Sequence, residues 1–234
     1  MTILLTDRND MGPDPVQQGE AMKHYSAVCF DFDYTLGDST DSIVAGFQYG
    51  FERLGHPIPD RETVRGTMLT GDRDPERLAR FRAYFLEVAK PRQRKETFLF
   101  PGAAELLQGL RAQGVRLGIV STKTGETIEY IMDRLGLGDC LDFVIGSSDV
   151  KHHKPHPEGL EMALDRLGLP PERVLYCGDT VLDAEAAQRA GLEFAAVLNG
   201  TTPASAFDVW PHVFLARDLD ALARFLEGRT RPAV

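Results

Sequence analysis

The chain has 234 residues, enough for one large domain or for a core with a smaller insertion, and its 43% hydrophobic and 26% charged residues are typical of soluble globular proteins. The formal net charge of -9 argues against a general nucleic-acid-binding protein and against a protein of anionic membranes, because both need a basic surface. An anionic substrate stays open, since a bound cation and a few local lysines set the field inside a site.

The cysteines and the apolar runs restrict the compartment. The three cysteines, Cys29, Cys140 and Cys177, are odd in number and lack C-x-x-C spacing, which argues against a disulfide framework or a zinc site. No apolar run approaches the length of about 18 residues that a membrane helix needs, and no signal peptide is recognisable. These features favour a cytoplasmic protein. Residues 1–24 are polar and turn-rich, and we expect a loosely ordered extension there.

From residue 27 onward, short apolar runs alternate with helical patterns. This alternation predicts a parallel sheet with helices on both faces, and the nearly continuous apolar runs predict strands buried on both sides. Gly114, Gly136, Gly168 and Gly191 each follow a helical pattern, where a left-handed residue ends a helix. The predicted strands are Ala27–Phe30, Arg116–Val120, Phe143–Ile145, Val174–Cys177, Phe194–Val197 and Val213–Leu215, and the predicted helices are Ala103–Gln113, Thr124–Leu135, Glu158–Leu167, Ala184–Ala190 and Leu219–Leu226.

One segment interrupts the alternation between the first strand and the first regular helix. It contains helical patterns at Ser42–Leu54 and Glu76–Lys90 and no convincing strand. We therefore expect a small helical domain inserted into an α/β core. The predicted division places the core at 25–37 and 99–234, the insertion at 38–98, and the hinges at Leu36–Ser39 and Thr97–Gly102.

Four polar clusters follow the ends of predicted strands or loop out from them. The carboxyl ends of parallel strands meet at one edge of the sheet, where α/β folds bind their ligands, so we expect the clusters to converge. Unpaired buried charge is costly, and paired carboxylates after a buried strand therefore indicate a bound cation or chemistry. The clusters are Asp31-Phe32-Asp33-Tyr34-Thr35, Ser121-Thr122-Lys123, Lys154-Pro155-His156-Pro157 and Gly178-Asp179-Thr180-Val181-Leu182-Asp183.

Each cluster taken alone has a purely structural interpretation. Aspartates such as those of the first cluster are common in turns, and Ser121 is a good helix N-cap. Lys154 could be a solvent-exposed lysine of a loop. The aspartates of the fourth cluster would stabilise a helix N-terminus. The histidines near Lys154 lack a convincing zinc pattern, because no cysteine or carboxylate ligand is near them at helical spacing. Only the four clusters together favour a site.

In this order and at these separations, the clusters resemble the motifs of the haloacid-dehalogenase-like phosphatase superfamily. The resemblance covers roughly residues 25–230. It implies a Rossmann-like parallel sheet and a cap inserted directly after the first motif. The helical segment 38–98 resembles the α-helical cap of the phosphoglycolate phosphatase-like and β-phosphoglucomutase-like members. Tyr34 stands where the family often has glycine, and it would narrow the site beside the cap.

The resemblance also implies catalytic roles. Asp31 would be the nucleophile that forms an aspartyl phosphate, and Asp33 would be the general acid and base. The second carboxylate at Asp33 separates the chain from the dehalogenases, which lack it. Ser121 and Lys154 would bind and stabilise the phosphoryl group.

The same resemblance implies further phosphate and metal ligands. The backbone N–H groups of Phe32 and Thr122 would lie near the phosphoryl oxygens. Mg²⁺ would be held by Asp31, Asp33 through its backbone carbonyl, and Asp179, with Asp183 in its second shell.

Within the cap, Arg65 and Thr67 are the candidates to contact the substrate, because relatives use this part of the cap for specificity.

The implied function is a Mg²⁺-dependent phosphatase acting on a small phosphorylated metabolite. Phosphoglycolate is the first candidate, from the cap boundaries including Phe100-Pro101-Gly102; a sugar phosphate or a nucleoside monophosphate are the others. The enzyme alternative is a phosphomutase of the β-phosphoglucomutase type. A non-catalytic binding protein on the same scaffold would lack a catalytic residue, and here every motif is present. Neither a nucleic-acid nor a membrane partner is expected, and both a monomer and a homodimer stay open.

Overall fold

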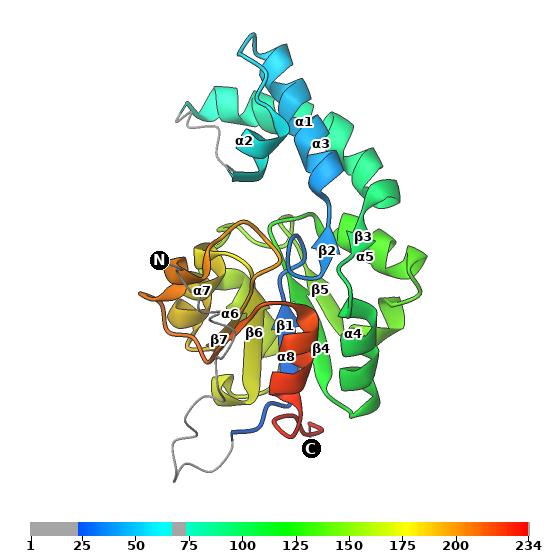
Figure 1. Cartoon of the computed structure of the whole chain (residues 1–234), viewed down its shortest axis with the longest axis vertical. Coiled ribbons are helices and arrows are strands. Elements are labelled where there is room, and N and C mark those ends of the chain that lie inside the picture. Colours follow the sequence, from blue (N-terminus) through cyan, green and yellow to red (C-terminus); the bar gives the residue numbers. More distant parts are fainter. Residues whose placement is uncertain (1–22, 67–73, 234) are drawn as a thin grey trace, which may run out of the picture.

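The computed structural model describes residues 23–66 and 74–233, and its centre is a six-stranded parallel sheet with helices on both faces (Figure 1). The strand order is β5-β4-β1-β6-β7-β8, so β1 lies between β4 and β6. This is the predicted α/β, Rossmann-like core. The strands are β1 (Ala27–Phe30), β4 (Arg116–Val120), β5 (Phe143–Ile145), β6 (Val174–Gly178), β7 (Glu193–Val197) and β8 (Phe214–Ala216).

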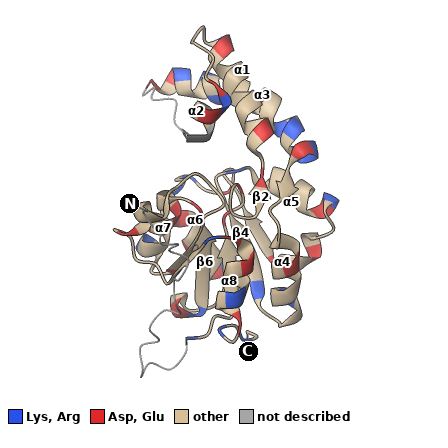
Figure 2. Ribbon diagram, in the orientation of Figure 1, with Lys and Arg blue, Asp and Glu red and all other residues tan. Residues whose placement is uncertain are grey.

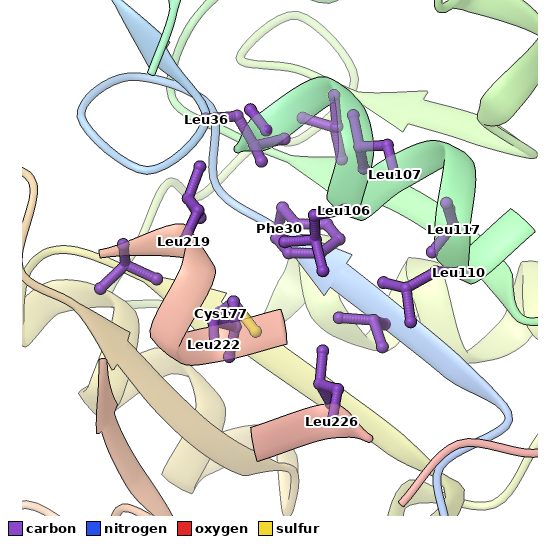
Figure 3. Close-up of a cluster of buried hydrophobic side chains, with 14 of the residues drawn as sticks. Phe30, Leu36, Leu106, Leu107, Leu110, Leu117, Cys177, Leu219, Leu222 and Leu226 are labelled. Carbon is purple, nitrogen blue, oxygen red and sulfur yellow. The ribbon is translucent and has the colours of Figure 1, made fainter. Parts of the chain in front are cut away.

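Apolar residues alternate between two clusters that lie on opposite faces of the sheet. In β1, Val28 and Phe30 belong to the cluster with helices α4, α5 and α8 (Figure 3), whereas Ala27 and Cys29 belong to the cluster with α6 and α7. Many of the charged residues lie on the helices (Figure 2), whereas β1 and β6 contain none. The helices of the core are α4 (Ala103–Ala112), α5 (Gly125–Arg134), α6 (Glu158–Leu167), α7 (Val181–Ala190) and α8 (Leu219–Leu226).

Core element ends agree with the predictions within three residues, and the differences have local causes. Helix α7 starts at Val181 instead of Ala184 because Thr180 and Asp183 form a capping box. The glycines predicted to end helices all have positive φ, from 63° at Gly168 to 76° at Gly114. Single 3-10 turns lie at Gly138–Cys140, Pro171–Arg173 and Ala204–Phe207.

The inserted segment contains helices α1 (Thr40–Arg53), α2 (Arg61–Gly66) and α3 (Pro75–Glu96), which lie beyond the carboxyl edge of the sheet (Figure 1). Their own apolar cluster includes Ile43, Phe47 and Phe81, with the rings of Phe47 and Phe81 5.3 Å apart. Helix α3 continues six residues past the predicted end at Lys90, through Pro91, because Ala89 and Gln93 are buried on either side of the proline. The boundaries 38–98 for this cap stay a prediction that the arrangement supports.

Both predicted hinges coincide with a feature that the sequence analysis missed. Strands β2 (Gly37–Asp38) and β3 (Phe98–Leu99) pair antiparallel and form a two-stranded ribbon where the chain enters and leaves the cap. The buried hydroxyl groups of Ser39 and Thr97 lie 2.9 Å apart beside it. Two-residue strands leave no period-2 pattern to read, so only the tertiary fold reveals this pairing.

The predicted N-terminal extension lies outside the described residues except for Lys23 and His24. Lys23 is tied to the sheet through an ion pair of 2.8 Å with Glu193. None of the helices in residues 23–66 and 74–233 combines the length and apolar composition that crossing a bilayer requires.

The contact between α1 and α3 depends on the absence of a side chain at Gly46. A Cβ atom there would lie 2.7 Å from Cδ2 of Phe85 and 2.9 Å from Cβ of Ala89. We expect Gly46→Ala to lower the free energy of unfolding by about 1–3 kcal/mol because of this overpacking. The matched control is Gly109→Ala in α4, where no atom lies within 4 Å, and which should raise it by up to about 1 kcal/mol. Urea titrations measure both, and a shift of both variants in the same direction would contradict the packing argument.

Candidate active site

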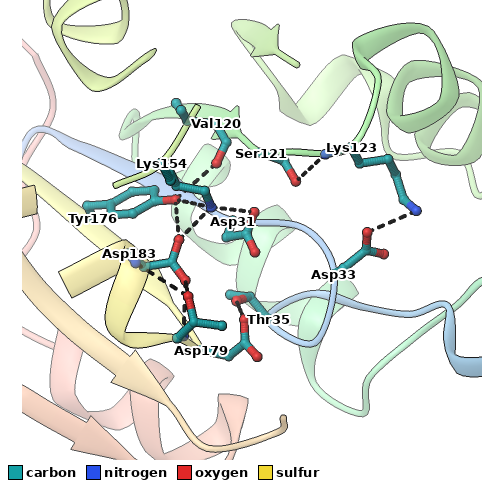
Figure 4. A network of polar contacts seen from close by, with 11 residues as sticks. Asp31, Asp33, Thr35, Val120, Ser121, Lys123, Lys154, Tyr176, Asp179 and Asp183 are labelled. Atoms are coloured by element: carbon teal, nitrogen blue, oxygen red, sulfur yellow. Dashed lines mark hydrogen bonds and ion pairs between the residues drawn. The ribbon is translucent and has the colours of Figure 1, made fainter. Parts of the chain in front are cut away.

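Lys154 joins three of the four polar clusters at the carboxyl edge of the sheet (Figure 4). Its Nζ lies 2.8 Å from Oδ1 of Asp31 and 2.5 Å from Oδ1 of Asp183. It also donates to the hydroxyl of Tyr176 at 3.0 Å. Although burial lowers the pKa of Lys154, Asp183 and Asp31 raise it above its ordinary value, so the lysine stays charged. The predicted convergence of these clusters is therefore present.

Asp183 is buried and committed to protein partners. Its Oδ2 accepts from the backbone N–H of Thr180 at 3.0 Å and from the Thr180 hydroxyl at 2.6 Å, while Oδ1 faces Lys154. Gly178 makes room for it, since a Cβ atom there would lie 2.5 Å from Cγ of Asp183. An aspartate held in this way orients Lys154 and the start of α7.

Asp179 is far less committed than Asp183. It is 4% exposed, and its Oδ1 accepts from the Thr35 hydroxyl at 3.5 Å. Thr35 thus contacts a side chain of the fourth cluster, and its own carbonyl accepts from Asn199 at 3.1 Å. Burial, followed by the charges of Asp183 and Asp31, raises the pKa of Asp179 well above its ordinary value.

Three carboxylates and one ammonium group leave an excess of negative charge at this edge. Oxygen atoms of Asp31, Asp179 and Asp183 all lie within 4.8 Å of one another. Burial raises the pKa of Asp31 to about 6, with Lys154 opposing and Asp183 adding to the shift. Oxygen-rich, doubly negative surroundings are those that Mg²⁺ prefers, so these residues fit a divalent cation.

The second cluster lies beside Asp31. The Ser121 hydroxyl hydrogen-bonds to the Asp31 carboxylate and lowers its pKa, and it also accepts from the backbone N–H of Lys123 at 3.3 Å. Thr122 lines a cleft of about 230 Å³ between the cap and the core, which Asp33 and Lys123 also line. Phe32 is fully buried, and its carbonyl accepts from the backbone N–H groups of Thr35, Leu36 and Gly37 in the turn that follows β1.

Lys123 is a residue to which the sequence analysis gave no role. Its Nζ lies 3.0 Å from Oδ2 of Asp33, and its side chain is only 3% exposed (Figure 4). The ammonium group also lies 5.8 Å from the centre of the Phe32 ring. The sequence signal that could have indicated a role for Lys123 was its place in the second polar cluster, two residues after Ser121. Tyr176, which supports Lys154, lies inside an apolar strand, and nothing in its local sequence indicates a polar role.

Two further predictions concern the contact between the cap and the site. Tyr34 has a left-handed backbone with φ of 60°, the conformation for which glycine is favoured, and its side chain packs in the cap cluster with Ile43 and Phe47. The expectation that Tyr34 narrows the site beside the cap stays a prediction. Arg65 lies in α2, and Thr67 lies outside the described residues.

The histidine loop corrects one argument from the sequence. A carboxylate does lie near His152 and His156, because the loop folds back onto the first turn of α6. Nδ1 of His152 is 2.8 Å from Glu158, whose carboxylate also accepts the backbone N–H groups of Lys151 and His152. These contacts hold the loop that carries Lys154.

Comparison with known proteins places the chain among relatives of one kind. The family model for haloacid dehalogenase-like hydrolases matches residues 28–197. Phosphoglycolate phosphatases of Salmonella choleraesuis and Salmonella typhi are 30% and 31% identical to the chain, over 74% and 73% of its length and 81% and 80% of theirs. The crystal structure of a haloacid dehalogenase-like hydrolase from Bacteroides fragilis has a TM-score of 0.81 at 38% identity, covering 85% of this chain and 99% of that one.

The surplus of negative charge predicts a thermal response to Mg²⁺. In chelator, Asp179→Asn should raise the melting temperature, because it removes one of three mutually repelling buried charges. A raised carboxyl pKa means that the fold favours the protonated form of Asp179, so the cost of its charge grows as the pH rises and becomes smaller as the pH falls. The gain from the substitution should therefore shrink as the pH falls. Mg²⁺ should stabilise the unsubstituted protein and lose that effect in Asp179→Asn; equal stabilisation of both proteins in scanning fluorimetry would refute the site.

Proposed function

The chain belongs to the haloacid dehalogenase-like hydrolase family, and from this membership we propose that it is a Mg²⁺-dependent phosphatase that hydrolyses a small phosphorylated metabolite through an aspartyl phosphate on Asp31. That it is a hydrolase of phosphate monoesters follows from the family model and from the relatives described above. The metal, the covalent intermediate and the substrate are the proposed part.

One observation carries the proposal: Lys154 bridges Asp31 and Asp183 at the edge where β1, β4 and β6 end. In the chain, Lys154 lies 123 positions after Asp31, and Asp183 lies further on still. A non-catalytic binding protein has no need to hold the ion pair between Asp31 and Lys154 beside the ion pair between Asp33 and Lys123. The complete arrangement therefore supports an enzyme.

In the first proposed step, an oxygen of the Asp31 carboxylate attacks the phosphorus atom of the ester. The P–O bond to the organic group breaks, and Asp33 in its protonated form gives a proton to the leaving oxygen. Lys154 and the Ser121 hydroxyl stabilise the charge that develops on the phosphoryl oxygens. The products of this step are the free alcohol and an acyl phosphate on Asp31.

In the second proposed step, Asp33, now ionised, takes a proton from a water molecule. The water oxygen attacks phosphorus, the bond between phosphorus and Asp31 breaks, and inorganic phosphate leaves. Both proton transfers return Asp33 to its starting form. Lys123 holds the Asp33 carboxylate in place through the 3.0 Å ion pair.

Asp31, Asp179 and the backbone carbonyl of Asp33 would hold the Mg²⁺, with Asp183 orienting its surroundings. When bound, the cation offsets the negative charge that the carboxylates and the phosphoryl group bring together. The contacts of Asp179 and Asp183 support these different roles. The carboxylate oxygens of Asp183 are already bound by Thr180 and Lys154, whereas Asp179 contacts the Thr35 hydroxyl.

The substrate is a small phosphate monoester. Phosphoglycolate is the first candidate substrate, because the relatives are named for it. Sugar phosphates and nucleoside monophosphates are the other candidates. A phosphomutase shares the first step but returns the phosphoryl group to a sugar. Release of free phosphate from several monoesters supports the phosphatase, and conversion of glucose 1-phosphate into glucose 6-phosphate would support the mutase.

Two substitutions and a chelator test the proposed chemistry. Asp31→Asn should abolish multiple turnover because it removes the nucleophile, and Asp33→Asn should lower kcat by about 10²–10⁴ because it removes the acid and base. Chelator should stop phosphate release, and added Mg²⁺ should restore it. Steady-state phosphate release with a panel of small monoesters measures all three. Multiple turnover by Asp31→Asn, or full activity in chelator, would overturn the corresponding role.

Lys123 gives a separate prediction. Lys123→Met keeps the length of the side chain and removes the charge beside Asp33, so we expect kcat to fall by about 10- to 100-fold. Lys123→Arg should recover part of the loss. Lys151→Met, on the exposed loop before Lys154, is the matched control and should keep full activity. Unchanged kcat in Lys123→Met would show that Asp33 needs no such partner.

A further inference from the structure

The loop that carries Lys154 holds a second group of metal-ligating side chains. His152, His156 and Glu158 each offer one ligand atom, and these three atoms all lie within 4.8 Å of one another. Within residues 23–66 and 74–233, the aspartates of the active site form the other group of this kind. Glu158 supplies the carboxylate whose absence near the histidines argued against a metal site in the sequence analysis.

The carboxylate of Glu158 is fixed beside the two imidazole rings. Its Oε1 accepts from the backbone N–H of Lys151 at 2.8 Å, and its Oε2 accepts from the backbone N–H of His152 at 2.9 Å. Oε2 also lies 2.8 Å from Nδ1 of His152. An ionised carboxylate has about four lone-pair positions, so these three contacts leave room for one more partner.

The ring of His156 completes the group. Its centre lies 4.6 Å from the centre of the His152 ring, and its Nδ1 accepts from the backbone N–H of Glu158 at 3.2 Å. The contact between His152 and Glu158 closes the loop without this third side chain. The position of His156 therefore adds a ligand that the ion pair alone does not need.

The donor atoms indicate which kind of ion would bind. Two imidazole nitrogens and one carboxylate oxygen form a ligand set that Zn²⁺ takes in proteins, with water in the fourth position. Ligand atoms around a tetrahedral Zn²⁺ lie about 3.3 Å apart, and side-chain rotation can bring these three residues to that spacing because both histidines are exposed. Mg²⁺ prefers oxygen ligands and is disfavoured by two imidazoles.

The position of this group along the chain links it to the active site. His152 and His156 lie two residues before and two residues after Lys154. The side chain of Lys154 is 9% exposed and contacts Asp31, whereas the side chain of His152 is 64% exposed. An ion bound by the two histidines would therefore join both ends of the short segment that places Lys154, and it would do so from the solvent side.

We propose that His152, His156 and Glu158 form a second metal site, which binds Zn²⁺ and clamps the loop that carries Lys154. The site differs from the proposed Mg²⁺ site in its ligand atoms and in its exposure. It acts on Lys154 through the backbone of the loop, so its three residues are positioning residues. The binding of Zn²⁺ here does not depend on which ester the enzyme hydrolyses.

Calorimetry with zinc chloride in excess Mg²⁺ tests the site. Asp179→Asn is the background, because it removes a ligand of the proposed Mg²⁺ site. This protein should bind Zn²⁺, and addition of either His152→Ala or His156→Ala should lower the affinity at least about tenfold. His212→Ala, an exposed histidine before β8, is the matched control and should leave the affinity unchanged.

Hydrogen exchange of the same proteins tests the clamp. Zn²⁺ should slow exchange several-fold in peptides that cover residues 151–157 of the Asp179→Asn protein, and it should leave peptides of α4 unchanged. The effect should disappear when His156→Ala is added. Neither measurement uses phosphate release, so a failure of the proposed function and a failure of this site are distinguishable.

Three results would overturn the zinc site: an affinity that His152→Ala and His156→Ala leave unchanged, an equal loss of affinity in His212→Ala, or displacement of Zn²⁺ by the excess Mg²⁺. Zn²⁺ binding that requires His156 but leaves exchange of residues 151–157 unchanged would overturn the clamp.

Discussion

The structure depends on a concentration of buried charge at one edge of the sheet. Asp31, Asp179 and Asp183 bring three carboxylates together, and Lys154 supplies one compensating ammonium group. Such a group of charges is tolerated only where the fold fixes its members, since leaving a buried charge unpaired is strongly destabilising. The strand order β4-β1-β6 provides this rigidity, because it places the end of β1 between the ends of its two neighbours.

The cap is joined to this edge by a short connection rather than a flexible linker. The β2–β3 ribbon, together with the contact between the Ser39 and Thr97 hydroxyl groups, ties the two chain crossings to each other. Tyr34, the residue after Asp33, packs among the cap helices. The segment that carries Asp33 is therefore in contact with both the core and the cap.

The relatives and the geometry answer different questions. Family membership covers the chemistry, since the matched segment 28–197 contains all four polar clusters. The cleft between the cap and the core is also lined by residues outside those clusters, Phe47 and Phe85 of the cap among them.

The sequence by itself determined the parallel α/β core, nearly all of its element ends, and the residues that meet at its edge, because period, turn residues and motif order are local properties of the chain. It assigned no role to Lys123 or to Tyr176, because a lysine inside a polar cluster and a tyrosine inside an apolar strand look ordinary until their partners are known. The β2–β3 ribbon, the full length of α3 and the ion pair between Lys123 and Asp33 were decided by the tertiary structure alone. Each of these depends on contacts between distant segments, and such contacts have no signature in local sequence.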